Sequence, residues 1–341
     1  MNAIYVLNQN FQLEGIIDEY VSTIWRPAYS EIGDFEIYLG ATGSALELLK
    51  PGRYVVRYGD ISMINGAITY RKVMIVKNIQ INTHSEDGDF LTVTGRELKY
   101  LLHQRIVWRQ TNLTGTPEDA IRRLISENAI EPDNSNRVIP RLAFGTPALL
   151  KDTIEKQVTG EYLDEVIVDI CNVYDYGWAI DIHDGNLTVE VYKGIDRSYD
   201  QTVRPYVVFS DDFENLYNTE YQVLTEHYAN TTLIGGEGEG LERIYTTVGA
   251  DEAGLARYET FTDARDISQN KGNEDEIPMA TYLALLSERG LENLASLSIT
   301  EGFSGEVLND VIFRYGEDFY LGDIVSVANK YGVQKNVRVI S

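Results

Sequence analysis

The sequence predicts a mainly β protein of the α+β class, in which two small β-barrel domains flank an α/β domain. Apolar residues recur with a period of two over residues 1–105 and again over most of 193–341, as in β-strands. A period of 3.6 appears between them, over 106–192. The chain has 341 residues, enough for two or three domains of about 150 residues each. Its 23 Tyr against 10 Phe favour half-exposed sheet faces and interfaces, where one end of the ring stays wet.

Acidic side chains dominate the charge of the chain. Lys and Arg number 29 and Asp and Glu number 53, which gives a formal net charge of −24. Such a chain is repelled by nucleic acids and by anionic membrane surfaces unless a local basic patch opposes the trend. Adjacent basic residues occur at Arg71-Lys72 and Arg122-Arg123, and neither pair makes a patch. A channel through which DNA slides without binding would also be negatively charged. The charge is therefore compatible both with a protein that avoids DNA and with one that lines a DNA channel.

Cysteine and histidine give no sign of a disulfide or a metal site. A single cysteine excludes an intramolecular disulfide and favours synthesis in a reducing compartment. The four histidines stand apart, without metal-ligand spacing: His84, His103, His183 and His227. No stretch approaches the roughly 20 apolar residues of a membrane-spanning helix. The first residues lack the basic and apolar segments of a secretory signal. We therefore expect neither a membrane-spanning helix nor a signal peptide.

Residues 1–105 are expected to form the strands of a small barrel or sandwich. One alternating apolar face is interrupted at Lys77, and residues 85–89 (SEDGD) make a turn before a partner strand at 90–94. Several short strands at this spacing are typical of such folds. A strand near residues 205–225 is a candidate to complete the domain. The apolar face consists of Val73, Ile75, Ile79 and Ile81.

Two helices are predicted within residues 106–192. Thr116 is a good N-cap and Pro117 suits the first helical position, and two acids follow at the positive end of the helix dipole. A second helix spans residues 162–174, because seven apolar or aromatic residues fall at helical spacing there. Its stripe includes Cys171, which we expect to be a buried and inert thiol.

A β-hairpin is expected after this second helix. Asp184-Gly185 fits a two-residue type I′ turn. Residues 181–186 lack the alternating acids and the twelfth-position glutamate of a calcium loop, so the hairpin turn is the better interpretation. The expected cross-strand pairs are Ile182 with Leu187, Ile180 with Val189, and Trp178 with Val191. All six side chains then share one face, which completes a small α/β domain.

Residues 193–341 are expected to form the second barrel-like domain, with one helix near 278–295. Pro278 opens this helix, and apolar residues recur every three or four positions after it. A short sequence similarity links the two β domains. The segments GRYVV at 52–56 and GDIVS at 322–326 share the order glycine, charge, apolar residue and valine.

The glycine-rich segment 235–240 (GGEGEG) does not fit a phosphate site. Glycine loops that bind phosphate present bare amides, lead into a helix and often include a lysine. Here two glutamates lie inside the segment and no lysine follows it. A tight bend or bulge between strands is the predicted role.

Pairs of acidic residues arise by chance in a chain with 53 acids. Glycosidases need two carboxyl groups about 5 or 6.5–9.5 Å apart across a sugar cleft. Within residues 261–267, pairing of Arg265 with neighbouring carboxylates is the better interpretation. No serine-hydrolase elbow, zinc-protease motif or Walker pattern occurs. The sequence therefore predicts no enzyme, and no catalytic, cofactor-binding or metal-binding residues. The candidate acidic pairs are Asp164 with Glu165, Asp211 with Asp212 and Glu214, and Asp263 with Asp266.

Six short segments resemble a known family when they are taken in order. They are residues 30–37 (SEIGDFEI), 93–98 (VTGREL), 101–107 (LLHQRIV), 234–240 (IGGEGEG) with Arg243, 261–267 (FTDARDI) and 318–325 (DFYLGDIV). Their order and separation resemble the tail-tip or baseplate hub (tail-associated) proteins of long-tailed phages and prophages of Gram-positive bacteria. These proteins are similar to the central hub of contractile-tail baseplates. The resemblance spans nearly the whole chain.

The resemblance implies a structural protein of the virion. Hubs of this kind carry two β-barrel domains per chain, and three chains form a ring of six similar barrels that matches a six-fold tail tube. The ring joins the tube to the host-binding tip and surrounds a DNA channel, which a charge of −24 per chain would keep non-sticky. The implied location is the tail tip, after synthesis in the cytoplasm of the bacterial host.

The implied partners are further copies of the chain, in a homotrimer, and other proteins of the same phage. These are the distal tail ring protein, the tape-measure protein and the receptor-binding or fibre proteins. The resemblance implies no cofactor, no specific nucleic-acid binding and no membrane span. The alternative hypothesis is a carbohydrate-active or cell-wall-glycan-binding protein that uses acidic and aromatic residues.

Overall fold

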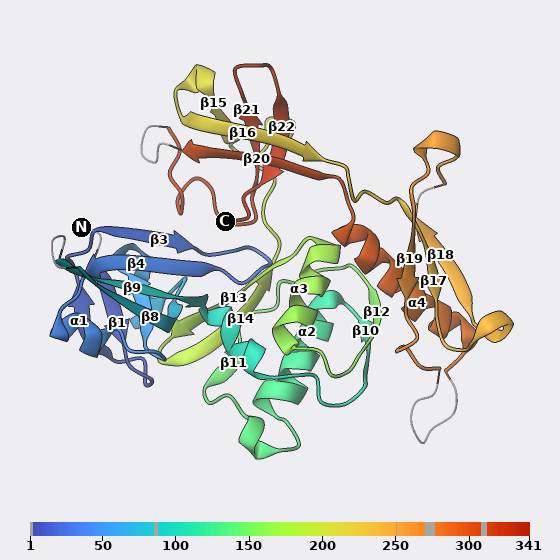
Figure 1. Cartoon of the computed structure of the whole chain (residues 1–341), viewed down its shortest axis with the longest axis horizontal. Helices are drawn as coiled ribbons and strands as arrows, with labels where there is room; N and C mark the ends of the chain where they lie inside the picture. Colours follow the sequence, from blue (N-terminus) through green and yellow to red (C-terminus); the bar gives the residue numbers. More distant parts are fainter. Residues whose placement is uncertain (1–2, 85–87, 250, 270–276, 308–311) are drawn as a thin grey trace.

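The computed structural model describes residues 3–84, 88–249, 251–269, 277–307 and 312–341 (Figure 1). Strands predominate, and helices pack against the sheets, so the expected α+β class is confirmed. Four units can be followed in Figure 1: a first β unit at the left, a middle α/β unit, a C-terminal β unit at the top and a smaller α/β unit at the right.

The first β unit is a seven-stranded antiparallel sheet with one short helix. It contains β1 (Ile4–Leu7), β2 (Leu13–Ile17), β3 (Ser22–Arg26), β4 (Asp34–Gly40), α1 (Gly43–Leu48), β5 (Tyr54–Arg57), β8 (Met74–His84) and β9 (Gly88–Glu97). The hydrogen-bonded order is β2-β1-β5-β8-β9-β4-β3. Because β2 and β3 stand at opposite ends of this order, the sheet stays open. The closed barrel expected for residues 1–105 is therefore not formed by the described strands.

β8 begins between two hydrophobic cores, which corrects the single apolar face expected for it. A bulge at Lys77 then shifts the register against β9. The shift brings Ile79 to the core of the first sheet, whereas Ile81 is 49% exposed. Four residues at the start are buried, with Met74 and Val76 in the core of the first sheet and Val73 and Ile75 in the core of the middle unit.

The middle unit combines two sheets with two helices. It contains β6 (Ile61–Ile64), β7 (Ala67–Tyr70), β10 (Thr111–Gly115), α2 (Pro117–Ile125), β11 (Leu142–Phe144), β12 (Ile154–Val158), α3 (Leu163–Tyr174), β13 (Gly177–His183) and β14 (Asn186–Tyr192). The sheet orders are β11-β14-β13-β7-β6 and β10-β12. Hairpin β6–β7 comes from the sequence of the first unit, yet it pairs with β13 at Tyr70 and Ile182.

The local predictions for the middle unit are confirmed. Thr116 caps α2 by accepting a hydrogen bond from the Asp119 amide at 3.1 Å, and Pro117 is the first helical residue. Asp184 and Gly185 have φ values of 48° and 73°, the left-handed conformations that a type I′ turn requires. The three expected cross-strand pairs of β13 and β14 occur in register.

Residues 193–341 form two units with separate cores instead of one barrel-like domain. The C-terminal β unit contains β15 (Val208–Ser210), β16 (Leu216–Leu224), β20 (Thr300–Val307), β21 (Ile324–Ala328) and β22 (Gln334–Arg338). Its sheet orders are β15-β21-β22 and β16-β20. The segment 205–225 therefore does not complete the first β unit, because its strands pair with β21 and β20 instead. These described strands close no barrel either.

The α4 unit is the smaller α/β unit at the right of Figure 1. It contains β17 (Thr231–Gly235), β18 (Tyr245–Gly249), β19 (Glu259–Asp263) and α4 (Met279–Ser296), in the sheet order β18-β17-β19. α4 matches the helix expected near 278–295 and covers the sheet with Leu285 and Leu286. Met279, expected in its apolar stripe, is 46% exposed.

The loop between β3 and β4 is held by a buried lysine. Lys99 is fully buried, and its ammonium donates to the carbonyls of Ala28 and Glu31 at 2.6 Å each. Glu97 balances this charge at 3.2 Å and accepts from the Gly33 amide at 3.0 Å. Burial lowers the pKa of Lys99, and the Glu97 carboxylate opposes that shift.

Tyr29, at the centre of this loop, joins three units. Its hydroxyl donates to the Asp175 carbonyl at 3.1 Å, and its backbone amide donates to the carbonyl of Ile340 at 2.9 Å. A Cβ at Gly177 or Gly322 would lie 2.1 or 2.2 Å from the Tyr29 ring, so both positions need glycine. The first, middle and C-terminal units therefore meet at one buried side chain.

An acid-rich interface joins α3 of the middle unit to α4. Lys156 and Glu292 form a buried ion pair across it. Glu288 accepts a hydrogen bond from the Tyr174 hydroxyl at 2.9 Å. Burial raises the pKa of Glu288, although its hydrogen bond from Tyr174 and the charge of Lys156 oppose the shift. This interface therefore holds more carboxyl groups than it can keep ionised at low free-energy cost.

We expect Lys99→Met to destabilise the chain strongly, because it leaves the Glu97 carboxylate buried without its cation. Removing one partner of a buried pair lowers the free energy of unfolding by about 3–5 kcal/mol. Urea denaturation measures the loss. The matched control is Lys50→Met, which removes the exposed pair with Glu47 and should change the unfolding free energy by less than about 1 kcal/mol. Equal losses in the two variants would contradict the role given to Lys99.

The raised pKa of Glu288 predicts a pH-dependent gain from Glu288→Gln. The native state holds the proton of Glu288 more tightly than the unfolded chain, so this group contributes stability at acid pH that is lost as the pH rises through its raised pKa. The variant should match the wild type near pH 4 and exceed its unfolding free energy at pH 7. Asp18→Asn, at an exposed position, controls for the loss of one charge. A difference that stays flat from pH 4 to 7 would show that burial does not shift this group.

Candidate functional site

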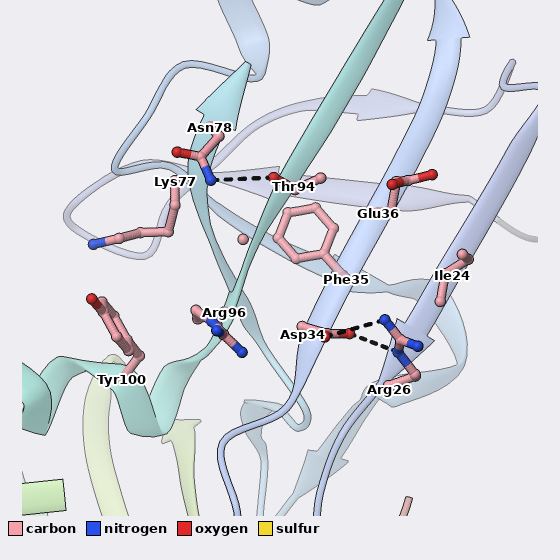
Figure 2. A pocket seen from close by; sticks show the side chains of 11 residues that line it. Ile24, Arg26, Asp34, Phe35, Glu36, Lys77, Asn78, Thr94, Arg96 and Tyr100 are labelled. Atoms are coloured by element: carbon pink, nitrogen blue, oxygen red, sulfur yellow. Dashed lines mark hydrogen bonds and ion pairs between the residues drawn. The ribbon is translucent and has the colours of Figure 1, made fainter. Parts of the chain in front are cut away.

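A pocket of about 390 Å³ opens on the exposed face of the first sheet, over β3, β4, β8 and β9 (Figure 2). Figure 2 shows Lys77 and Tyr100 on one side of it, the pair Arg26 and Asp34 on the other, and Arg96 between them. The Arg26 guanidinium donates twice to the Asp34 carboxylate, at 2.7 and 3.2 Å. The face thus carries cationic side chains in a chain whose net charge is −24.

A stack of rings leads from this pocket to α3. The Lys77 ammonium lies 4.6 Å from the centre of the Tyr100 ring, a cation–π contact. Tyr100 stacks on His103 with ring centres 4.8 Å apart, and His103 stacks on Tyr162 at 4.2 Å. His103 Nδ1 lies 3.0 Å from the buried carboxylate of Asp164, in the first turn of α3. The stack fixes the position of Tyr100 at the pocket rim.

His103 and Asp164 resemble two members of a catalytic triad, but the third member is missing from the described residues. The His103 ring has hydrogen bonds to Asp164 alone among them. The one thiol, Cys171, is fully buried, and burial raises its pKa to about 12. Cys171 is therefore the inert core thiol that the sequence predicts. The dyad can orient a ring and hold α3 in place, and no nucleophile is hydrogen-bonded to it within the described ranges.

The glycine-rich segment 235–240 forms a bend whose backbone is already occupied. Arg243 donates to the carbonyls of Gly235 and Gly236, at 2.7 and 3.0 Å. The Glu237 amide donates to the Tyr282 hydroxyl at 2.6 Å. An arginine and a tyrosine of this chain therefore fill the space that a phosphate would need, as expected for a bend.

The candidate acidic pairs of residues 261–267 are held by arginines. Arg265 and Arg243 both donate to Asp263, at 2.6 Å each. The hydrogen bond from Arg265 holds the pKa of Asp263 well below its usual range. Asp266 pairs with Arg289 of α4 at 2.9 Å, a partner that the local sequence did not indicate. These carboxylates serve structural ion pairs.

The described ranges contain neither a metal-binding cluster nor a helix that could span a membrane. Within them, no group of three or more His, Cys, Asp or Glu side chains is arranged to hold a metal ion. No helix of the described chain has the length and apolar character needed to cross a bilayer.

Sequence reasoning missed the cationic side chains of the pocket, although a signal existed. Lys77 breaks the alternating pattern of β8, and the structure places it in a bulge that turns it toward Tyr100. Arg96 stands between the buried residues Gly95 and Glu97, so strand alternation puts it on the exposed face. Such single basic residues are not adjacent in sequence, and a count of basic pairs does not find them.

Comparison with solved structures gives the fold of the whole chain. A tail protein from Neisseria meningitidis MC58 matches with a TM-score of 0.57 and 13% identity, over 99% of this chain and 90% of that one. The 43 kDa tail protein of prophage MuSo2 from Shewanella oneidensis matches at 0.56 and 14%, over 98% and 92%. Prophage tail protein gp18 from Listeria monocytogenes EGD-e matches at 0.53 and 13%, over 100% and 89%.

The family comparison agrees with the fold. No curated protein matches the sequence. The model of one family, described as siphovirus ReqiPepy6 Gp37-like protein, matches residues 3–341, nearly the full length. The resemblance to phage and prophage tail proteins is thereby confirmed at the level of family and fold. The chain belongs to the siphovirus ReqiPepy6 Gp37-like protein family.

Proposed function

We propose that this chain is a structural protein of a phage or prophage tail, and that three copies form the hub at the tail tip. The observation that carries the proposal is the shared fold, which extends over 98–100% of the chain in three tail proteins. The hub joins the tail tube to the host-binding tip and surrounds the channel for DNA. Its role is mechanical, without enzymatic activity.

The presence of two β units in one chain supports the trimer. Gly52 and Gly322 both have left-handed backbones, with φ of 85° and 90°, and each stands two residues before a strand of its unit, β5 or β21. The similar segments at these two glycines therefore also have the same local structure, a left-handed glycine before a strand. Three chains with two such units each would present six β units to a six-fold tube. The barrels of the hub are proposed to be completed by contacts between copies.

The proposed domains keep the order of the sequence prediction, residues 1–105, 106–192 and 193–341. The last domain contains both the C-terminal β unit and the α4 unit, and hairpin β6–β7 of the first domain joins the middle sheet. The proposed partners are the distal tail ring protein, the tape-measure protein and the receptor-binding or fibre proteins of the same phage. The excess of acidic residues supports a channel that DNA passes without specific binding. The proposed location is the tail tip of the virion, after synthesis in the host cytoplasm.

A second candidate function, binding of a cell-wall glycan, is favoured by one groove. It measures about 650 Å³ and lies over β15, β21 and β22. Exposed Tyr199 and Tyr206 form its wall, with ring centres 5.3 Å apart. Ser326 donates to Asn336 at 2.7 Å on its floor. Aromatic walls with a few convergent polar groups suit a sugar chain.

The trimer predicts a solution mass of three times 38.5 kDa, or 115.5 kDa. Light scattering over a wide concentration range measures it. If the chain alone stays at 38.5 kDa, the measurement is repeated with the hexameric tail ring protein, which should then recruit three copies. A chain that stays monomeric under both conditions would contradict the hub.

The glycan candidate predicts binding of peptidoglycan fragments that Tyr199→Ala weakens about tenfold or more, because stacking on the ring is lost. Glycan arrays and calorimetry measure binding, and a turnover assay detects cleavage. The control is Tyr331→Ala, at an exposed tyrosine outside the groove. Blank results in both assays would remove this candidate and leave the structural role unaffected.

A further inference from the structure

The three segments of the chain differ in charge. Residues 1–105 hold 10 Lys and Arg against 12 Asp and Glu, and residues 106–192 hold 7 against 15. Residues 193–341 hold 12 against 26, so most of the net charge of −24 lies in the C-terminal part. Copies of such a chain repel one another unless a near-neutral or cationic surface of one copy meets an acidic surface of the next.

The cationic sheet face, defined as Arg26, Lys77, Arg96 and Tyr100 around the pocket of Figure 2, is such a surface. Arg26 is neutralised by Asp34. Among the described residues, neither Lys77 nor Arg96 has an ion pair with a carboxylate, and Arg96 is exposed. Asp34 and Glu36 also line the pocket, so its three cations and two carboxylates give the face a net charge of +1 beside the Tyr100 ring.

The acidic turn, defined as residues 211–214, is the complementary surface. It begins with the short 3₁₀ helix Asp211–Phe213 and ends at Glu214. Asp211 accepts from the Lys330 amide at 3.0 Å, whereas the carboxylates of Asp212 and Glu214 have no partner in the described part of the chain. Phe213 stands between them and is 51% exposed. An exposed aromatic ring flanked by carboxylates is suited to a pocket flanked by cations.

The two surfaces do not meet within one molecule. β15 and the turn that follows it lie at the top of Figure 1, whereas β4, β8 and β9 lie at the lower left. Contact between the cationic sheet face and the acidic turn thus requires a second copy of the chain. A contact between two different surfaces is heterologous, and it closes into a ring when the rotation between copies is a third of a turn.

We propose that the cationic sheet face of each copy binds the acidic turn of the next copy around the ring. This inference rests on the proposed trimer and names its contact. Lys77 and Arg96 pair with Asp212 and Glu214 of the neighbour, and the Phe213 ring of the neighbour enters the pocket beside Tyr100. Charged pairs at such a rim are screened by salt, so the trimer weakens as ionic strength rises.

A charge-swap experiment tests the contact under the condition in which the wild type trimerises, alone or with the tail ring protein. Lys77→Glu with Arg96→Glu should weaken trimer formation at least tenfold, and Asp212→Lys with Glu214→Lys should do the same. The chain that carries all four substitutions should trimerise again, because the opposite charges are restored with their positions exchanged. Light scattering and sedimentation measure the trimer, and circular dichroism with thermal unfolding verifies the fold of each variant.

The matched control is Lys50→Glu with Arg109→Glu, which makes the same change of net charge at exposed positions outside the pocket. This control should trimerise as the wild type does. The proposed contact would be wrong if trimers still form with either pair of substitutions, or if the chain with all four substitutions fails to trimerise. Neither result would argue against the trimer itself. A wild type that never trimerises would instead overturn the proposed function. If Lys77→Glu with Arg96→Glu lowers DNA binding and leaves the trimer unchanged, the face serves nucleic acid and the contact is wrong.

Discussion

The buried ammonium of Lys99 is the constraint on which the arrangement of the units depends. An unpaired charge in a protein interior is very unfavourable, so the carbonyls of the β3–β4 loop must stay turned toward it, and Glu97 must stay beside it. That requirement fixes the loop, and the loop fixes Tyr29. Because Tyr29 contacts the middle unit and the last strand region, one side chain on the first unit sets the geometry of three. A well-packed apolar residue could contribute as much stability, but it would not orient a loop in this way.

Local patterns in the sequence predicted elements well and distant pairings poorly. The hairpin of β13 and β14, the Thr116 cap and the buried Cys171 follow from spacing over a few residues, and all three are confirmed. The pairing of segment 205–225 with β20 and β21 depends on contacts more than 70 residues apart along the chain, and the open first sheet on contacts about 50–60 residues apart. No local period reports such contacts. The candidate pocket was missed for a different reason, because the bulge that turns Lys77 toward Tyr100 shows in the sequence only as one break in the alternation of β8.

The many carboxylates of the chain divide into two groups with different physical roles. Those of the interior are matched by cations, as Glu97 is by Lys99 and Asp323 is by Arg197, or share a crowded interface as Glu288 does. Those of the surface give the chain its long-range field and concentrate toward the C-terminal end. The proposed contact between copies needs this field to be uneven, because a uniform negative field would make the copies repel one another.

The pairing of hairpin β6–β7 with the middle sheet has a consequence for synthesis on the ribosome. β7 ends at Tyr70, and its partner β13 starts at Gly177, more than 100 residues later. At about 5–20 residues per second, the hairpin leaves the ribosome roughly 5–20 s before that partner exists. During this interval Met63 and Ile68, which stay exposed even in the folded chain, lie beside an unpaired strand edge. The hairpin can therefore dock only after β13 has been made, so the middle sheet is completed later in synthesis than the strands of the first sheet.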